Sequence, residues 1–309
     1  MTGRIALKVD VDTLRGTLEG VPPLVDLLKR HRVNATFLFS LGPDNTGRAL
    51  RRIFRPGFLG KVLRTSVAAN YGLKTLCYGT LLPAPNISAR AGDVMRSVRD
   101  AGFEVGVHCN DHVLWQDRVA AQSYAWTRQQ MQLAIEAFEG VFGEQPKVHG
   151  SAGWQMNEHV PRLEAELGFD YASDSRGSEP FMPVFADEAS PCPQLPTTLP
   201  TFDEVIGLAG CTEENVADVL LDRSLEPSAH AHVFTLHAEL EGMRLRPAFE
   251  RLLQLWLDRD LQPCSMREIY QRLPRSLPRH TIELAQIEGR SGPLACQGTI
   301  HPFRQRLTG

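Results

Sequence analysis

The chain has 309 residues, of which 42% are hydrophobic, and a formal net charge of −3. This hydrophobic content is enough for the core of one large α/β domain or two small ones, which excludes a disordered chain. No apolar run approaches the roughly 18 residues of a membrane-spanning helix, and a strand-like segment that begins at Arg4 leaves no room for a signal peptide. Six scattered cysteines without a C-x-x-C pair indicate free thiols. Together these features predict a cytosolic protein.

Strand-like and helix-like segments alternate along most of the chain. Residues 4–11 have the pattern of a buried strand, and residues 21–32, with two prolines near their start, have that of a helix. The further expected strands cover 34–40, 103–107, 147–149, 169–173, 194–196 and 232–236, and the further expected helices cover 92–101, 123–142, 157–167, 212–221 and 247–256. A last strand and helix end near residue 273.

This alternation implies a mostly parallel sheet, either doubly wound or closed into a barrel. The polar residues favour the barrel, because they lie at or just past the ends of expected strands, where a (β/α) barrel gathers its catalytic groups: Asp12, His108, His149, Asp174 and His237. An open Rossmann sheet would need a Gly-rich phosphate loop after its first strand, and residues 12–16 do not form one. We therefore expect an irregular (β/α) barrel.

The end of the first strand carries two carboxylates, Asp10 and Asp12. Because the side chains of a strand alternate between its faces, both point to the same side. His108 and His112 are four residues apart, which would place them on one face of a helical turn. One carboxylate and two imidazoles make an open site for a divalent ion such as zinc, manganese, cobalt or nickel, with the second carboxylate as a candidate base. Alternatively, the acids are solvated or capping residues and the histidine spacing is fortuitous.

An apolar strand ends in His237. A histidine at such a position is often structural. Beside a metal site at the same barrel rim, however, it is a natural general acid.

One segment of the chain is strongly basic. Residues 45–92 contain no acidic residue and carry a charge of +8, so the rest of the chain carries −11. Such segregation indicates an anionic partner, and the interleaved leucine, phenylalanine and tyrosine residues favour a membrane surface over a nucleic acid. The alternative is a solvated basic helix whose apolar face joins the core.

The order Asp-x-Asp, His-x-x-x-His and Leu-His resembles the polysaccharide deacetylase, or NodB-homology, family of metal-dependent amide hydrolases. In that family the two aspartates are usually adjacent, whereas Val11 separates them here. The order of the residues indicates Asp10 as the base and Asp12 as the ligand, and the separation leaves this division open. The resemblance implies a single domain over residues 1–273 with a lipid-facing insertion at 45–91, and a tail at 274–309 that packs on the domain or extends from it.

Seven longer segments, in the same order, resemble the bacterial members of this family that deformylate undecaprenyl-phosphate-linked 4-deoxy-4-formamido-L-arabinose. They are residues 8–13, 39–44, 55–61, 78–83, 150–157, 193–200 and 234–239. The resemblance implies hydrolysis of the N-formyl group at the cytosolic face of the bacterial inner membrane, a step towards aminoarabinose-modified lipid A and polymyxin resistance. The alternatives are a soluble carbohydrate or small-amide deacetylase and a non-catalytic phospholipid-binding module.

The resemblance also implies roles for single residues. Asp174 matches the aspartate that orients the acidic histidine. The family's third motif has an arginine that tethers the base; this sequence has His149 there and Arg176 later, and either could substitute. We also expect His149, Gly150, Trp154 and Arg176 to bind the substrate. A backbone N–H in the segment from Gly150 to Trp154 could hold the oxyanion, with Trp154 as a wall over the sugar. The lipid phosphate and membrane would meet Arg51, Arg52, Arg55, Phe58 and Lys61.

Overall fold

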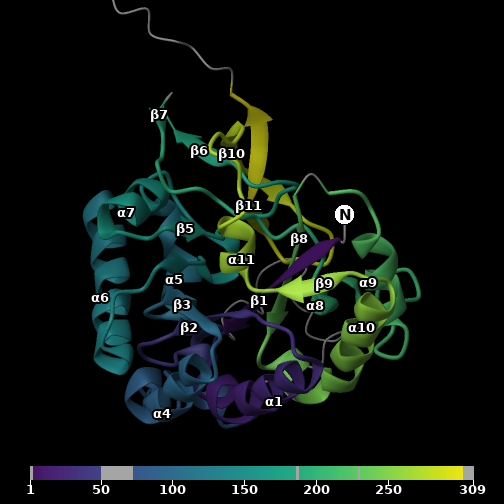
Figure 1. The fold of residues 1–309 in the computed structure, drawn as a ribbon. Coiled ribbons are helices and arrows are strands. Elements are labelled where there is room, and N and C mark those ends of the chain that lie inside the picture. The colour runs from purple at the N-terminus through teal and green to yellow at the C-terminus, as the bar shows by residue number, and fades with distance from the viewer. Residues whose placement is uncertain (1–2, 50–71, 186–187, 229, 302–309) are drawn as a thin grey trace, which may run out of the picture.

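The computed structural model describes residues 3–49, 72–185, 188–228 and 230–301, and a parallel sheet ringed by helices forms its centre (Figure 1). The order of the strands is β5-β4-β3-β2-β1-β8, and β9 pairs with the start of β1. Their bounds are β1 Arg4–Val11, β2 Thr36–Ser40, β3 Glu104–Cys109, β4 Val148–His149, β5 Tyr171–Ala172, β8 His232–His237 and β9 Gln262–Cys264. The alternation of segments along the sequence therefore produces the parallel sheet that it predicted.

Irregular chain closes the gap between β5 and β8. Leu195 N–H donates to the Ala172 carbonyl at 2.8 Å, and two residues later Thr197 N–H donates to the Ser175 carbonyl at 3.0 Å. On the other side, Thr198 N–H donates to the Val233 carbonyl of β8 at 3.1 Å. Residues 194–196, predicted as a short strand, form isolated bridges instead of a strand, such as that of Gln194 with Ala172. These bridges turn the sheet into an irregular barrel, and the barrel prediction is confirmed.

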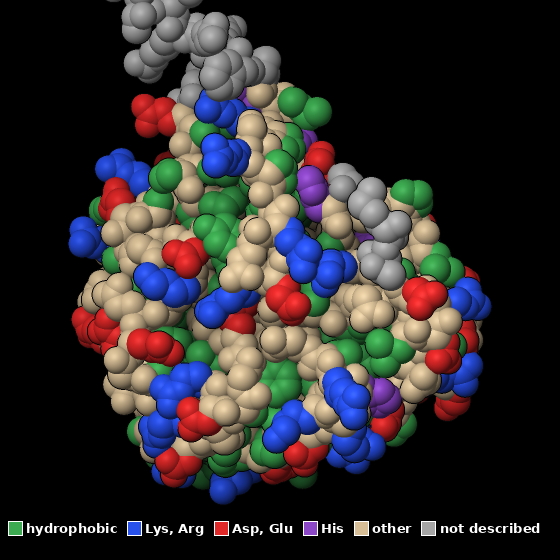
Figure 2. Space-filling view, viewed as in Figure 1, with side chains coloured by type: hydrophobic (Ala, Val, Ile, Leu, Met, Phe, Trp, Pro, Cys, Tyr) green, Lys and Arg blue, Asp and Glu red, His purple; other side chains and the backbone are tan. Residues whose placement is uncertain are grey.

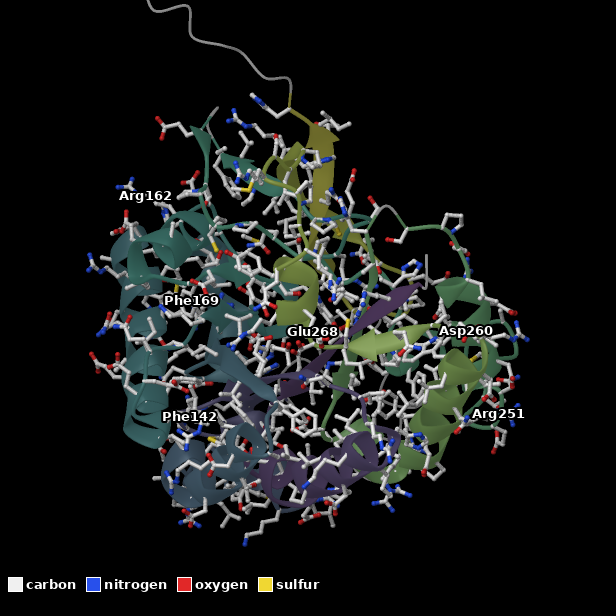
Figure 3. The ribbon with its side chains drawn as sticks, viewed as in Figure 1. Phe142, Arg162, Phe169, Arg251, Asp260 and Glu268 are labelled. Atoms are coloured by element: carbon white, nitrogen blue, oxygen red, sulfur yellow. The ribbon has the colours of Figure 1, made fainter. Side chains whose placement is uncertain are left out.

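Helices cover the outside of the barrel. They are α1 Val21–His31, α4 Ile87–Asp100, α5 His112–Arg118, α6 Tyr124–Phe142, α7 Val160–Leu167, α8 Phe202–Val205, α9 Val216–Ser224 and α10 Arg246–Asp258. Aromatic side chains such as Phe142 and Phe169 lie between helices and sheet, while Arg162 of α7 and Arg251 of α10 project outwards from the surface (Figure 3). The face in Figure 2 has a mixed surface, with basic and acidic side chains interspersed over the helices.

The alternation of side chains in β1 separates two buried layers. Val9 and Val11 pack towards the helices, in the large core cluster. Ala6 points into the barrel, where it meets a smaller cluster that includes Leu38 and Val233. A short helix, α11 (Met266–Tyr270), lies in the middle of the ring of strands in Figure 1 and contributes Met266 to this interior cluster. The apolar filling of the barrel leaves its polar residues for the ends of the strands.

The basic segment is described only in part. Residues 50–71 lie outside the described residues, and with them the predicted lipid-binding residues Arg51, Arg52, Arg55, Phe58 and Lys61. Helix α4 begins at Ile87, capped by Asn86, whose side chain accepts a bond from Ala89 N–H. This is five residues earlier than predicted, so the end of the expected insertion belongs to the helix.

The C-terminal residues form a hairpin rather than a plain tail. Strands β10 (Arg279–Gln286) and β11 (Pro293–Ile300) are antiparallel, and they join β6 (Met182–Phe185) and β7 (Glu188–Ala189) in a second sheet. The hairpin is attached to the barrel through Arg176, whose N–H donates to Ala295 and whose carbonyl accepts from Gln297. Among the described residues, no helix is long and apolar enough to cross a bilayer.

Candidate functional site

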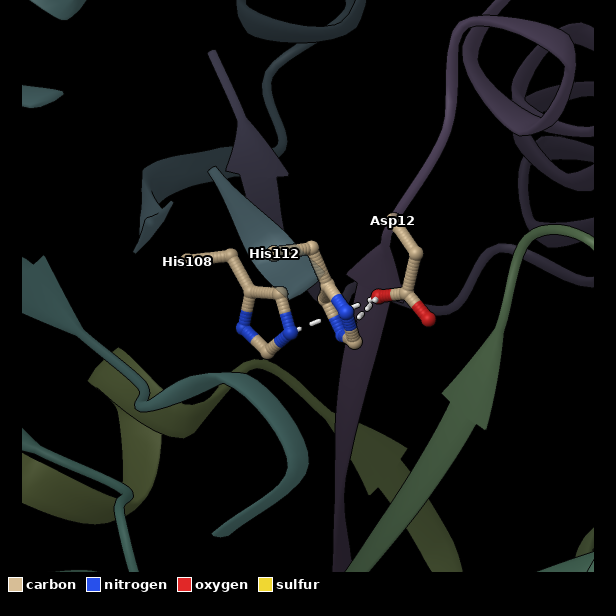
Figure 4. A group of neighbouring side chains, drawn as sticks. All are labelled: Asp12, His108 and His112. Atoms are coloured by element: carbon tan, nitrogen blue, oxygen red, sulfur yellow. Dashed lines mark ion pairs between the residues drawn. The ribbon is translucent and has the colours of Figure 1, made fainter. Parts of the chain in front are cut away.

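Three side chains from different elements meet at the carboxyl end of the sheet. Asp12 Oδ1 lies 3.3 Å from His108 Nε2 and 3.4 Å from His112 Nε2 (Figure 4). Asp12 follows β1, His108 lies in β3, and His112 is the first residue of α5. The structure thus brings together the three residues that the sequence predicted as metal ligands.

The helical turn expected for the two histidines is wrong. His108 still belongs to the strand, and Asp111 caps α5 by accepting a bond from Leu114 N–H at 3.0 Å, so the turn between them separates a strand from a helix. A capping aspartate favours a helix start at the next residue, which is His112. Asn45 fixes this cap, because its side-chain amide donates to the other Asp111 oxygen at 2.6 Å.

The ring of His108 is fixed in one orientation. Its Nδ1 donates to the Gly150 carbonyl at 2.6 Å, which leaves Nε2 as the nitrogen that faces Asp12. A carbonyl partner on the far nitrogen is the usual support of a metal-binding histidine.

A buried glutamate holds the loop that carries Asp12. Glu239 Oε1 accepts from the N–H groups of Asp12 and Thr13, at 3.1 and 2.9 Å, and from the Thr13 hydroxyl at 2.7 Å. A side chain at Gly16 would displace this carboxylate, because a Cβ there would lie 1.9 Å from Glu239 Oε1. The residues after β8 therefore position the end of β1.

The three side chains suit a divalent ion. Burial alone would raise the pKa of Asp12, but the charges of His112 and His108 beside it hold the pKa well below its usual range. Asp12 Oδ1 is buried and has no hydrogen bond among the described residues. Two ligand atoms bound to one tetrahedral zinc ion lie about 3.4 Å apart. The observed separations of 3.3 and 3.4 Å match this spacing.

Asp10 and His237 flank this group. They are paired residues of the neighbouring strands β1 and β8. Asp10 Oδ1 and His237 Nδ1 are both buried without a hydrogen bond within the described part of the chain. Buried polar atoms without partners are rare in native proteins, and their convergence here indicates a place for a ligand or substrate.

Trp154 forms a wall beside His237. Its ring meets the imidazole edge to face, at 6.3 Å and 79° between planes, and its Nε1 donates to the Thr197 hydroxyl at 3.1 Å. Its φ of 51° lies in the left-handed region, an uncommon and strained conformation for a tryptophan. Two guanidinium groups lie over the ring, at 5.3 Å for Arg176 and 4.7 Å for Arg290.

Arg176 contacts residues that surround and support the site. It pairs with Glu204 and donates to the carbonyls of Thr197 and Leu199. Arg290, from the turn of the C-terminal hairpin, pairs with the same Glu204 at 2.7 Å and with Asp203 at 3.2 Å. The substrate-binding role of Arg176 stays a prediction.

His149 and Asp174 belong to a second buried group. His149 Nδ1 lies 2.7 Å from Glu164 and 3.2 Å from Asp174, and Asp174 also accepts from Ser151 N–H at 2.7 Å and from Gln194 at 2.7 Å. Burial lowers the pKa of His149, but the charge of Asp174 and hydrogen bonds to both acids raise it to about 9. The same contacts hold the pKa of Asp174 below its usual range against the effect of burial.

This second group is an ion pair that braces the loop from Gly150 to Trp154. The partners of Asp174 named above do not include His237, so its predicted role in orienting that histidine rests on the resemblance alone. The substrate contact of His149 likewise stays a prediction.

The sequence predictions omitted three residues at the site. Lys8 lies on the same face of β1 as Asp10 and Asp12 and pairs with Asp10, and strand alternation alone could have found it. Glu239 stands two residues after His237, in one of the segments that carry the resemblance. No local pattern marks Arg290, which reaches the site only through the pairing of the C-terminal hairpin.

The sequence model of the polysaccharide deacetylase family matches residues 3–172, more than half of the chain. The chain belongs to the polysaccharide deacetylase family. A Shewanella sediminis protein is 33% identical over 297 residues, 96% of this chain and 95% of its own length. One from Wigglesworthia glossinidia brevipalpis is 32% identical over 92% of this chain and 99% of its own. Both are named as 4-deoxy-4-formamido-L-arabinose-phosphoundecaprenol deformylase ArnD.

Solved structures share the fold of this polysaccharide deacetylase. A Mycobacterium smegmatis protein described as a polysaccharide deacetylase superposes with a TM-score of 0.57 at 20% identity, over 90% of this chain and 95% of its own. A Pseudomonas aeruginosa protein of the same description gives 0.54 at 18% identity, over 87% and 91%. The predicted family and fold are confirmed.

Proposed function

We propose that this chain is a metal-dependent deformylase that hydrolyses the N-formyl group of 4-deoxy-4-formamido-L-arabinose linked to undecaprenyl phosphate. The observation that carries the proposal is the meeting of Asp12, His108 and His112, with Asp10 and His237 beside them. The names of the two ArnD relatives supply the substrate. The reaction belongs to the aminoarabinose modification of lipid A, which underlies polymyxin resistance.

The residues of the site have two roles: three would bind the metal ion, and two transfer protons. A divalent ion held by Asp12, His108 and His112 would polarise the formamide carbonyl and lower the pKa of water. Asp10 takes the proton from the attacking water. His237 donates a proton to the nitrogen as the C–N bond breaks, so that formate and the free amine leave.

Two further groups shape the place of the substrate. Trp154 lies against the sugar beside His237, on the strained turn described above. For the oxyanion, the N–H groups of Gly150, Ser151 and Trp154 already donate within the protein. The proposed donors to the oxyanion are therefore the two remaining N–H groups of this loop, those of Ala152 and Gly153.

The lipid-linked substrate requires access to a membrane, and we propose peripheral binding at the cytosolic face of the inner membrane. Leu73 and Leu81 are 77% and 84% exposed, in the described part of the basic segment. Their loop is tied to the site, because Gly47 N–H donates to Tyr78 and Asn45 holds the Asp111 cap before His112. Exposed leucines among basic residues favour an anionic lipid surface.

The experiment is mass spectrometry of the lipid-linked formamidosugar incubated with purified protein that carries zinc, manganese, cobalt or nickel in turn. We expect loss of the formyl group and release of formate. The N-acetyl analogue and the formamidosugar without its lipid phosphate are the controls. Equal turnover of the soluble sugar would support a soluble carbohydrate deacetylase instead, and no turnover with any metal would contradict an enzyme.

A further inference from the structure

The first strand carries a buried cation on its catalytic face. Side chains of β1 alternate, so Lys8 shares the barrel face with Asp10 and Asp12. Its side chain is 0% exposed. The ammonium group donates to the Ser173 carbonyl at 3.0 Å and lies 3.4 Å from Asp10 Oδ2. A buried ammonium is costly unless it is paired, so these two contacts account for its presence.

The surroundings of Lys8 belong to the site. Its Nζ lies 5.3 Å from the centre of the Trp154 ring. Its chain passes Gly150, where an added Cβ would lie 3.2 Å from Lys8 Cε. Among the described residues, Asp10 is the one acid within ion-pair distance of Lys8.

His108 Nδ1 lies 3.9 Å from Asp10 Oδ1, but it already donates to the Gly150 carbonyl. Two further cations near the site have other partners. His149 pairs with Glu164 and Asp174. Arg176 pairs with Glu204 and with two backbone carbonyls. Neither forms an ion pair with Asp10 in the described structure.

We propose that Lys8 is the positioning residue of Asp10: its ammonium holds Oδ2 and leaves Oδ1, which has no hydrogen bond, to accept the proton. This inference rests on the proposed function, because the role of Asp10 as base belongs to it. In this role Lys8 acts through Asp10 and not on the water or the sugar directly. In this proposal Lys8, a residue of the first strand, takes the place of the family's arginine that tethers the base. Neither His149 nor Arg176 takes that place, because neither pairs with Asp10.

A kinetic double-mutant cycle tests whether Lys8 acts through Asp10. The variants are Lys8→Met, Asp10→Asn and the two combined, with kcat and KM for formate release measured separately. We expect Lys8→Met alone to lower kcat by about tenfold or more with KM changed less than about threefold, and to have little further effect in the Asp10→Asn background. Lys8→Arg should recover part of kcat, and Lys147→Met, at an exposed lysine, should match the wild type. If Lys8→Met lowered kcat by the same factor in the wild-type and the Asp10→Asn backgrounds, the proposal would be overturned.

A second cycle needs no substrate. Lys8→Met leaves Asp10 buried and unpaired, so we expect Tm to fall by about 5 °C or more, and Asp10→Asn in the same chain to restore over half of the loss. Bound metal per chain should stay at the wild-type value. Additive Tm changes, or loss of metal in Lys8→Met, would overturn the proposal. If the two positions are coupled but the lipid-linked sugar is not hydrolysed, the proposed substrate fails and the pairing stands.

Discussion

Asp10 and His237 are paired residues at the ends of two neighbouring parallel strands. The pairing of β1 with β8 runs without a break from Ile5 and His232 to this point, and the next N–H, of Ala238, donates to the Asp10 carbonyl at 3.0 Å. Main-chain hydrogen bonds therefore place the proposed base and acid relative to one another. A site built on strands holds its geometry more closely than one built on loops.

The first prediction concerns these two residues. Asp10→Asn and His237→Ala should each lower kcat by about 10² or more, because each removes a positioned proton carrier. Bound metal per chain should be unchanged, since neither belongs to the group of three ligands. Asp100→Asn and His230→Ala, at exposed positions, are the matched controls. Rates near the wild type in either site variant would refute the assignment.

The second prediction concerns the ligands. Asp12→Asn should weaken metal binding by more than about tenfold, because it removes the charged ligand between the two imidazoles. In the wild type, a chelator should lower Tm and added metal should restore it, since an ion at 100 times its Kd stabilises the folded chain by about 2.7 kcal/mol. Elemental analysis and thermal unfolding measure both effects. A chelator-independent Tm would argue against an ion at this site.

The sequence predicted the fold well where local patterns suffice. Buried strands and amphipathic helices have distinct periods, and polar residues at strand ends distinguished the barrel from an open sheet. Asp12, His108 and His112 met as expected, although the histidine spacing was assigned to a helical turn. The cap at Asp111 starts the helix only at His112, so the same spacing spans a strand, a turn and a helix start.

Contacts between distant residues were beyond such patterns. Glu239 reaches the Asp12 loop across 227 positions of the sequence, and Arg290 reaches Glu204 across 86. Neither residue stands out by type or spacing, because its role depends on how the sheets are assembled. Lys8 is different, since the strand period that aligned Asp10 with Asp12 also includes it.

The third prediction concerns the membrane. Leu73→Ser with Leu81→Ser should weaken binding to vesicles of anionic lipid, because both leucines are exposed beside basic residues. Activity on the lipid-linked sugar should fall more than activity on a soluble sugar. Replacing Arg51, Arg52 and Arg55 by Ser should act in the same direction. Leu284→Ser, at an exposed leucine of the C-terminal hairpin, is the control; equal effects on both substrates would contradict the proposal.

The fourth prediction concerns the hairpin. Arg290→Met removes a cation that lies over Trp154 and pairs with Glu204 and Asp203. We expect KM to rise more than kcat falls, since Trp154 would lose a neighbour that fixes the proposed sugar wall. Tm should fall as well, because the two acids lose a partner. Arg259→Met, at an exposed arginine, is the control. If Arg290→Met lowered Tm but left KM unchanged, Arg290 would contribute to stability alone and not to the substrate site.

The fifth prediction concerns the pH dependence of stability. The pKa of His149 rises to about 9 from an ordinary value of 6.5, because Asp174 and Glu164 bind its protonated form. A group whose pKa is higher in the folded chain stabilises fully below its unfolded pKa and loses this effect as the pH rises through the folded value. The difference corresponds to about 3 kcal/mol, present below pH 6.5 and lost towards pH 9 and above.

His149→Gln removes this contribution, so the variant should be less stable than the wild type near pH 6, with the difference in Tm shrinking as the pH approaches 9. Glu241 does not belong to the group of His149. Burial raises its pKa to about 8, so its contribution to stability also falls as the pH rises, in the variant as in the wild type. Burial and the charge of Asp174 also raise the pKa of Glu164, which contacts His149. The comparison of the two Tm profiles therefore reports on His149 together with Glu164, with His230→Gln as the exposed control. A Tm difference that stays constant from pH 6 to 9 would show that His149 is not held as a cation by Asp174.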